Sequence, residues 1–252
     1  MENVAVIPAR FASTRLPGKP LLSDTGKPLI QHVVEAARRA QSLQRVIVAT
    51  DDERIADAVR GFGGEVVMTR ADHPTGTDRV AEVAATIPNA GIIVNVQGDE
   101  PEIEGASIDR LIALLRDDPD APMATLATPI RDEAVYRDPS CVKVVASSRG
   151  RALYFSRSPI PFHRDAAPDF SDPAAPAALL HLGIYAYRRD FLLRVGDLPR
   201  SPLESFEKLE QLRVLEAGLP IALGVVDEPS IGIDTPEDYR RFVERRRRAG
   251  LA

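Results

Sequence analysis

The chain has 252 residues, a formal net charge of −5 and a single cysteine, Cys141. The negative balance argues against a protein that binds nucleic acid over its whole surface, and one cysteine excludes an intrachain disulfide and a thiolate metal cluster. No apolar run reaches the roughly 18 residues of a membrane span, and no basic and then apolar leader opens the chain. We therefore expect a cytoplasmic protein with no nucleic-acid or membrane partner.

The first half of the chain alternates apolar runs with amphipathic stretches. The predicted strands are Val4–Ile7, Arg45–Thr50, Glu65–Thr69 and Ile92–Val96. The predicted helices are 29–40, one capped by Asp51 or Asp52 with Ile55, Ala56 and Val59 facing inward, 76–87 and 107–116. Short connections between near-continuous apolar strands indicate an α/β fold, with a mainly parallel sheet covered by helices on both faces.

The alternation of strands and helices ends at about residue 117, after which strands follow one another without long helices. These strands are predicted at Met123–Ile130, Val142–Val145, Ala152–Arg157, His181–Tyr187 and Ile221–Val226. The segment Pro159–Pro176 has the composition of a long surface loop of the kind that often forms a lid or a partner contact. A helix over 203–217 and a last helix ending in the solvated cluster Arg245–Arg248 complete the smaller, β-rich extension.

A cationic loop follows the first strand. We expect Pro8 to end the strand, because proline has no N–H to donate to the ladder. Three cations follow within ten residues, Arg10, Arg15 and Lys19, among small side chains that allow a polyanion to approach the backbone. Arginine and lysine grip phosphate oxygens, so this loop at the end of a strand is a candidate triphosphate site. Ordinary solvated loop cations are the alternative.

Polar clusters follow the strands at four places in the chain. They are 9–19, Thr69–His73, Gln97–Asp99 and Ile233–Thr235. The carboxyl ends of parallel strands share one edge of a sheet, so the clusters are expected to meet in one cleft. There Asp99 and Asp234 suit Mg²⁺, which takes one or two carboxylates together with substrate phosphates and water. A turn role for Asp99, and a helix-capping role for the segment of Asp234, Thr235 and Asp238, are the alternatives.

Common nucleotide and hydrolase motifs are absent. The sequence has no phosphate-binding G-x-x-x-x-G-K-[ST], no dinucleotide G-x-G-x-x-G after the first strand and no G-x-S-x-G nucleophile motif. The four histidines lack the spacing of a zinc site.

Eight segments, in order along nearly the whole chain, resemble the 3-deoxy-manno-octulosonate (KDO) cytidylyltransferases, also called CMP-KDO synthetases. They are IPARFASTRLPGKPL, VATDDERIADAV, MTRADHPTGTDR, VNVQGDEP, ALYFSRSPIP, HLGIYAYRRDFL, SPLESFEKLEQLRVLEAG and GIDTPEDY. The resemblance implies a single nucleotide-diphospho-sugar transferase-like domain with a nucleotide-binding half, 1–120, and a sugar-binding and dimerisation half, 121–252. It also implies a homodimer that converts CTP and KDO into CMP-KDO and diphosphate with Mg²⁺, for lipopolysaccharide biosynthesis.

The same resemblance assigns roles residue by residue. Lys19, Asp99 and Asp234 are the implied catalytic residues, and the last two also the implied metal ligands. The implied nucleotide-binding residues are Ala9, Arg10, Ser13, Arg15, Lys19, Thr69, Arg70, Ala71, Thr77, Arg79 and Gln97. The implied KDO-binding residues are Gln97, Arg157, His181, Tyr185, Glu210 and Gln211. Either Arg157 or His181 suits the KDO carboxylate.

Two rival interpretations remain at this point. A cytidylyltransferase for sialic acid would share the fold and the chemistry, although its first loop typically reads as a glycine-serine-lysine run. A catalytically silent nucleotide-binding protein on the same fold would bind CTP without releasing pyrophosphate.

Overall fold

The computed structural model describes residues 1–12, 16–172, 175–227 and 231–250. Contacts divide the chain into two compact units, 1–109 with 230–252, and 110–229. The expected halves, 1–120 and 121–252, were defined by function, and their roles stay a prediction. The units differ from these halves in two respects: the boundary falls after residue 109, and residues 230–252 belong with the first unit.

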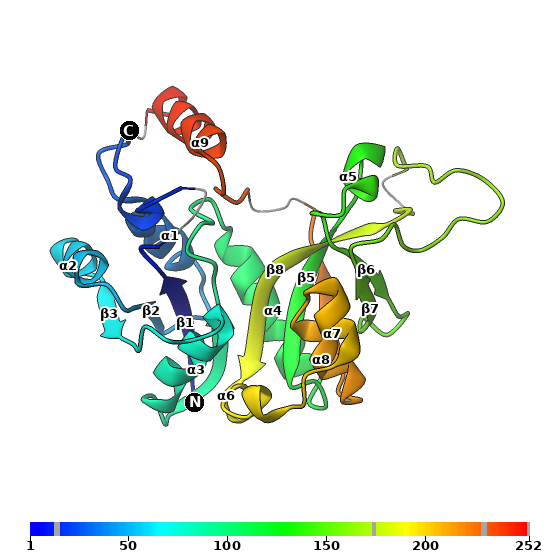
Figure 1. The fold of residues 1–252 in the computed structure, drawn as a ribbon, viewed down its shortest axis with the longest axis horizontal. Helices are drawn as coiled ribbons and strands as arrows, with labels where there is room; N and C mark the ends of the chain where they lie inside the picture. The colour runs from blue at the N-terminus through cyan, green and yellow to red at the C-terminus, as the bar shows by residue number, and fades with distance from the viewer. Residues whose placement is uncertain (13–15, 173–174, 228–230, 251–252) are drawn as a thin grey trace. The chain divides into compact units, whose positions relative to one another are not determined.

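The first unit contains a parallel sheet in the order β3-β2-β1-β4 (Figure 1). Its strands are β1 (Glu2–Ala9), β2 (Arg45–Thr50), β3 (Glu65–Met68) and β4 (Ala90–Asn95). Its helices are η1 (Lys19–Leu21), α1 (Leu29–Ala37), α2 (Glu53–Gly61), α3 (Gly76–Ala85) and α9 (Pro236–Arg248), and α4 (Gly105–Asp117) crosses the boundary between the units. The predicted alternation of strands and helices is therefore confirmed.

Strand β1 is the centre of this sheet, paired with β2 on one side and β4 on the other. Its residues 4–7 are completely buried. Because successive side chains of a strand point to opposite faces, burial of all four means that both faces are covered, as the apolar run predicted.

The expectation that Pro8 ends β1 was wrong, because the strand continues to Ala9. The carbonyl of Val6 accepts a hydrogen bond from the N–H of Val96, just after β4. Because backbone groups of alternate residues in a strand point to the same side, the backbone nitrogen of Pro8 also faces β4. The register with β4 ends at Val6, and Pro8 therefore lacks its N–H where no ladder partner is needed. On the other side the pairing with β2 continues through Pro8 and Ala9.

The second unit contains a mixed set of strands. β5 (Met123–Pro129) is antiparallel to β8 (Leu179–Arg188) and parallel to β9 (Ile221–Val225), and β6 (Lys143–Ala146) pairs antiparallel with β7 (Ala152–Ser156) and β8. Short helical segments α5 (Glu133–Arg137), α6 (Arg189–Leu192) and η2 (Val195–Asp197) were not predicted. The predicted β-rich extension is confirmed, and the described part of 159–176 contains no helix or strand.

The single helix predicted over 203–217 is wrong, because the segment forms α7 (Pro202–Glu207) and α8 (Gln211–Glu216). Between them Lys208 takes the left-handed conformation, with φ of 55°. The break leaves the carbonyl of Glu207 available to the guanidinium of Arg157, which donates to it at 2.7 Å. Phe206, near the end of α7, is 80% exposed.

Helix α9 returns to the first unit and packs beside α1 (Figure 1). Pro236 occupies its first turn, and Thr235 with Asp238 forms a complete capping box. Tyr239 and Phe242 join Leu29 in one buried cluster. The cluster 245–248 was expected to be solvated, but Arg245 turns back to pair with Glu102 at 2.5 Å.

His32 of α1 is buried beneath α9. Its ring lies edge-on to Phe242, with 5.2 Å between the ring centroids, and its Nε2 lies 2.7 Å from the hydroxyl of Thr25. Burial, together with the nearby charge of Arg246, lowers the pKa of His32 to about 4.

We predict that His32 makes the free energy of unfolding decrease as the pH is lowered. Unfolded His32 binds a proton below about pH 6.5, whereas folded His32 stays neutral to about pH 4. The contribution of neutral His32 to the free energy of unfolding is fully present above pH 6.5. It is lost as the pH falls toward 4, at about 1 kcal/mol per pH unit. In His32→Gln, whose amide can bond Thr25 without titrating, denaturant unfolding at pH 7.5, 6 and 5 should show a correspondingly smaller slope. An unchanged slope would refute the assignment.

Candidate active site

The first cluster of the candidate site is centred on the ammonium of Lys19, at the start of η1. Its Nζ donates to Asp99 Oδ2 at 2.8 Å, to the carbonyl of Ile233 at 2.8 Å and to Asp234 Oδ1 at 3.4 Å. The side chain of Lys19 is 13% exposed, whereas those of Asp99 and Asp234 are 31% and 51% exposed. Residues separated by more than 200 positions in sequence therefore meet around one positive charge, as the polar clusters predicted.

The backbone brings Asp234 to this position. The N–H of Ile233 donates to the carbonyl of Asp99 at 2.9 Å, and the side chain of Ile233 is fully buried in the cluster beneath α9. The capping interpretation of the segment is confirmed, because Thr235 and Asp238 cap α9. Asp234 contacts Lys19, and its role as a metal ligand stays a prediction.

Gly98 lets the Asp99 segment pass close to β1. A Cβ on Gly98 would lie 2.8 Å from the backbone carbonyl oxygen of Pro8, closer than real Cβ contacts allow. The absence of a side chain at this position is thus what places Asp99 beside the end of β1.

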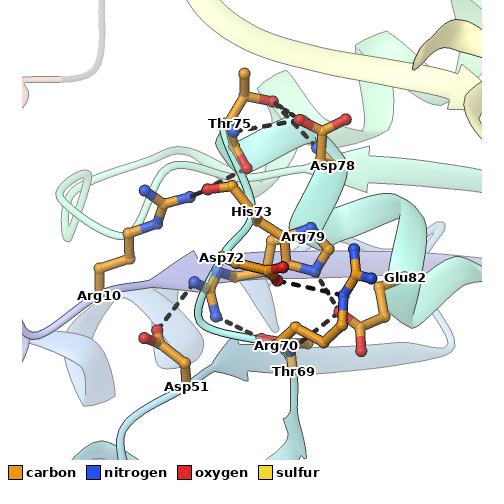
Figure 2. A network of polar contacts seen from close by, with 10 residues as sticks. All are labelled: Arg10, Asp51, Thr69, Arg70, Asp72, His73, Thr75, Asp78, Arg79 and Glu82. Carbon is orange, nitrogen blue, oxygen red and sulfur yellow. Dashed lines mark hydrogen bonds and ion pairs between the residues drawn. The ribbon is translucent and has the colours of Figure 1, made fainter.

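A second cluster ties the loop after β1 to the loop after β3 (Figure 2). The guanidinium of Arg10 donates to the carbonyls of His73 and Thr75, at 2.6 and 3.3 Å. Glu82 of α3 accepts from the backbone N–H of Arg70 at 3.2 Å and forms a close contact with the ring of His73. Residues 70–72 stay exposed, so the loop between these anchors offers its backbone to solvent.

Arg79 is the buried foundation of this second cluster (Figure 2). It is 0% exposed, pairs with Asp51 Oδ1 at 2.9 Å and closely contacts Thr69 Oγ1. Burial lowers the pKa of Arg79, opposed by the neighbouring carboxylate of Asp51. We interpret Arg79 as a support of the loop, because its side chain is enclosed by protein and does not face solvent.

The remaining nucleotide-side residues lie at the same edge of the first unit. Ala9 is the buried last residue of β1, Thr77 lies half-buried in the first turn of α3, and Gln97 lies half-buried two residues after β4. Ser13 and Arg15 lie outside the described residues.

In the second unit, His181 and Tyr185 of β8 are brought together by a bulge. The register between β5 and β8 shifts between Thr125 and Leu126, which leaves two extra residues in β8. Residues four apart in a regular strand are about 13 Å apart, but these two rings have centroids 5.5 Å apart. The bulge therefore builds an aromatic surface to which Phe155 of β7 adds, 4.8 Å from the ring of His181.

His181 is a neutral ring in this surface. Burial lowers its pKa to about 3. The hydroxyl of Thr125 donates to the carbonyl of Ile184 at 2.8 Å, and so it accepts from Nε2 of His181, 3.0 Å away. His181 therefore does not supply a cation for a sugar carboxylate, and its contact with the sugar stays a prediction. Burial also raises the pKa of Tyr185, helped by the charges of Tyr187 and Glu210.

Arg157 follows β7 and is held by backbone carbonyls. Its Nε donates to Glu207 O at 2.7 Å and its Nη1 to Pro139 O at 3.0 Å, while its own N–H donates to the carboxylate of Glu207 at 2.9 Å. Gln211 is 4% exposed, and its Nε2 has no hydrogen-bond partner among the described residues. Glu210, beside it, is exposed.

Sequence reasoning missed several supporting residues. Asp51 was considered only as a helix cap, and Glu82, Thr125 and Glu207 gave no local signal, because their partners are 9 to 56 positions away in sequence. Lys143 could have been noticed as a lysine inside an apolar strand.

The metal-binding capacity of the described residues is limited. Nowhere in the described parts of the chain do three or more histidine, cysteine or acidic side chains gather as a ready metal site. The pair Asp99 and Asp234 nevertheless already accommodates a positive charge, that of Lys19, and both carboxylates are partly exposed. This donor set fits a hard divalent ion that takes its other ligands from phosphate and water.

Comparisons with known proteins define first the class of protein. Residues 4–222 match the profile of the cytidylyltransferase family. A solved structure of CMP:2-keto-3-deoxy-manno-octonic acid synthetase complexed with CTP is 46% identical, with a TM-score of 0.91 over 99% of this chain and all of that one. A 4-diphosphocytidyl-2C-methyl-D-erythritol synthase from Anaerococcus prevotii, 12% identical with a TM-score of 0.63 over 98% and 99% of the two chains, shares the fold.

The particular family follows from curated relatives. The 3-deoxy-manno-octulosonate cytidylyltransferases of Syntrophotalea carbinolica and Geobacter sulfurreducens are 56% and 53% identical. The matches cover 96% and 97% of this chain and 97% and 99% of the relatives. This chain belongs to the 3-deoxy-manno-octulosonate cytidylyltransferase family, which confirms the resemblance, the fold class and the enzyme class predicted from the sequence.

We predict that Gly98→Ala slows cytidylyl transfer about 10- to 100-fold, because moving a catalytic group by about 1 Å can have an effect of that size. The added Cβ must push the Asp99 segment away from the carbonyl of Pro8. The matched control is Gly61→Ala, at the end of α2, where a Cβ would meet nothing within 4 Å. Transfer rate and melting temperature should be measured for both. A Gly98→Ala enzyme at the wild-type rate would contradict this account.

Proposed function

We propose that this chain transfers the cytidylyl group of CTP to KDO, giving CMP-KDO and diphosphate. The observation that carries the proposal is the meeting of Lys19 with Asp99 and Asp234 at the edge of the sheet. The relatives named for this activity and the solved synthetase complexed with CTP support the same choice of substrates.

The first unit supplies the groups for the nucleotide. Arg10 and Lys19, with Ser13 and Arg15 of the same loop, bind the triphosphate, and the segment 69–71, of which residues 70 and 71 are exposed, reads the base. Thr77 and Gln97 lie at the same edge, and Arg79 supports the base-reading loop from below. The bonds from Arg10 to the carbonyls of residues 73 and 75 couple the phosphate loop to the base loop.

Asp99 and Asp234 hold Mg²⁺ in this proposal. When bound, the ion acidifies the attacking hydroxyl and offsets phosphate charge. The two carboxylates orient the ion, and Lys19 fixes the spacing of the two carboxylates by bonding both.

The chemistry is an in-line displacement at phosphorus. The anomeric hydroxyl of KDO loses its proton and its oxygen bonds to the α-phosphorus, while the bond from that phosphorus to the oxygen bridging to the β-phosphate breaks. Positioning and charge neutralisation supply most of the rate enhancement in such transfers. Lys19 and Arg10 stabilise the negative charge that builds up on the departing diphosphate.

The second unit supplies the groups for the sugar. Arg157 faces the carboxylate, the neutral His181 and Tyr185 form hydrogen bonds and stacking contacts, and Glu210 and Gln211 bind hydroxyls. The buried, unpartnered amide nitrogen of Gln211 supports a polar ligand here. The enzyme acts in the cytoplasm as a homodimer that supplies lipopolysaccharide assembly, with no nucleic-acid partner. Among the described residues, no helix has the length and apolar character to cross a membrane.

The direct test is a substrate panel. CTP, UTP and ATP are each incubated with KDO or sialic acid, with and without Mg²⁺, and pyrophosphate release is measured. We expect release only with CTP, KDO and Mg²⁺ together. Turnover of sialic acid would assign the rival substrate, and CTP binding without release would make the protein catalytically silent.

We predict that Asp99→Asn nearly abolishes turnover, by a factor of about 100 to 1000, the range found when one group that stabilises developing charge is removed. Lys19 can still donate to the amide oxygen, so the fold should persist. Circular dichroism and the melting temperature check folding, and pyrophosphate release checks activity. A near-normal rate in this variant would remove Asp99 from the proposed metal site.

A further inference from the structure

Lys143, the first residue of β6, is a buried cation to which the proposed reaction gives no role. Its side chain is 0% exposed. Its ammonium donates to the carbonyls of Asp138 at 2.9 Å, Arg157 at 2.7 Å and Cys141. Three acceptors around one nitrogen require all three protons of an ammonium, so the geometry fits the charged form.

No carboxylate among the described residues lies within ion-pair distance of Lys143. The nearest acidic group in sequence, Asp138, is exposed and accepts through its side chain from Ser140; its charge only partly opposes the lowering of the Lys143 pKa by burial. Burying a charge without an ionic partner is costly, and a lysine bonded only to carbonyls could be replaced by a neutral donor. The retained charge therefore calls for a function.

The sheet register places Lys143 among the sugar-side residues. Lys143 pairs with Ser156 of β7 and with Leu180 of β8, which immediately precede Arg157 and His181. The N–H of His181 donates to the carbonyl of Val142 at 2.8 Å. The ammonium thus bonds the backbone of Arg157, and β6 pairs with the strand that carries His181.

Among the buried and half-buried groups the charges sum to a positive value; the exposed carboxylate of Asp138, which also interacts with Lys143, lies outside this set. Arg157 and Lys143 are cations, the half-buried carboxylate of Glu207 accepts from Arg157 N and Ser156 Oγ, and His181 is neutral. One positive charge is left over in a weakly screened environment, where it acts over a longer range than at the surface.

We propose that Lys143 is a specificity-determining and positioning residue: its buried positive charge selects a sugar that carries a carboxylate, and its bond to the carbonyl of Arg157 fixes that residue. The inference rests on the proposed function. It predicts that Lys143 contributes to the discrimination between a sugar acid and the same sugar with an uncharged carboxamide.

The test crosses the enzyme's charge with the substrate's charge. kcat/KM is measured for KDO and for KDO carboxamide with wild type, Lys143→Met and Arg149→Met, an exposed cation in the turn of the same β6–β7 hairpin. Wild type should prefer KDO strongly, and Lys143→Met should lose at least about tenfold of that preference, mainly through the KM for KDO, while the KM for CTP stays unchanged. Arg149→Met should keep the preference.

If Lys143 had a purely structural role, Lys143→Met would lower kcat/KM equally for KDO and for KDO carboxamide. An unchanged preference for KDO in folded Lys143→Met would overturn the proposal. If that variant does not fold, Glu207→Gln serves instead. It removes a negative charge, while its amide can still accept from Arg157 N and donate to Ser156 Oγ. Its preference for KDO over the carboxamide should rise, and an unchanged or smaller preference would refute the charge effect. Wild type that does not turn over KDO would instead refute the proposed function.

Discussion

The contact between the ammonium of Lys19 and the carboxylates of Asp99 and Asp234 is the constraint on which the nucleotide side depends. Each partner reaches it by a different route: η1 after the cationic loop, the segment after β4, and the segment before α9. A single cation holds all three because like-charged carboxylates repel one another unless a positive charge lies between them. The same repulsion explains why the pair is suited to a divalent ion.

The backbone around this contact is specified by residues that carry no charge. Gly98 permits the close approach to Pro8, and Pro8 is tolerated because its missing N–H falls where the ladder with β4 has ended. The buried Ile233 anchors the segment of Asp234 in the core beneath α9. The positions of the polar groups thus follow from apolar packing and from one glycine, which explains why a local charge pattern alone cannot define the site.

Much of the first unit could be predicted from the sequence, because its strands are apolar throughout and its helices have clear periodicity. The convergence of the segments after β1 and β4 followed from parallel topology, whereas the approach of 233–235 did not. The second unit was less accessible. The break at Lys208 accompanies the bond from Arg157 to Glu207, and the proximity of His181 and Tyr185 depends on a bulge. Both are tertiary effects that override the local pattern. Burial also removed the charge that the sequence allowed for His181.

The two units neutralise charge by different physical means. The proposed nucleotide side uses partly exposed ions, Arg10, Lys19 and the two aspartates, which in the proposed reaction exchange protein partners for phosphate oxygens and metal. The sugar side instead surrounds its cations with backbone carbonyls: Lys143 with three, Arg157 with two. Carbonyl dipoles stabilise a buried cation without cancelling its charge, whereas a carboxylate would do both. A field that persists in the absence of substrate is preorganised, and it suits recognition of a fixed carboxylate better than binding of a triphosphate whose charge moves during the reaction.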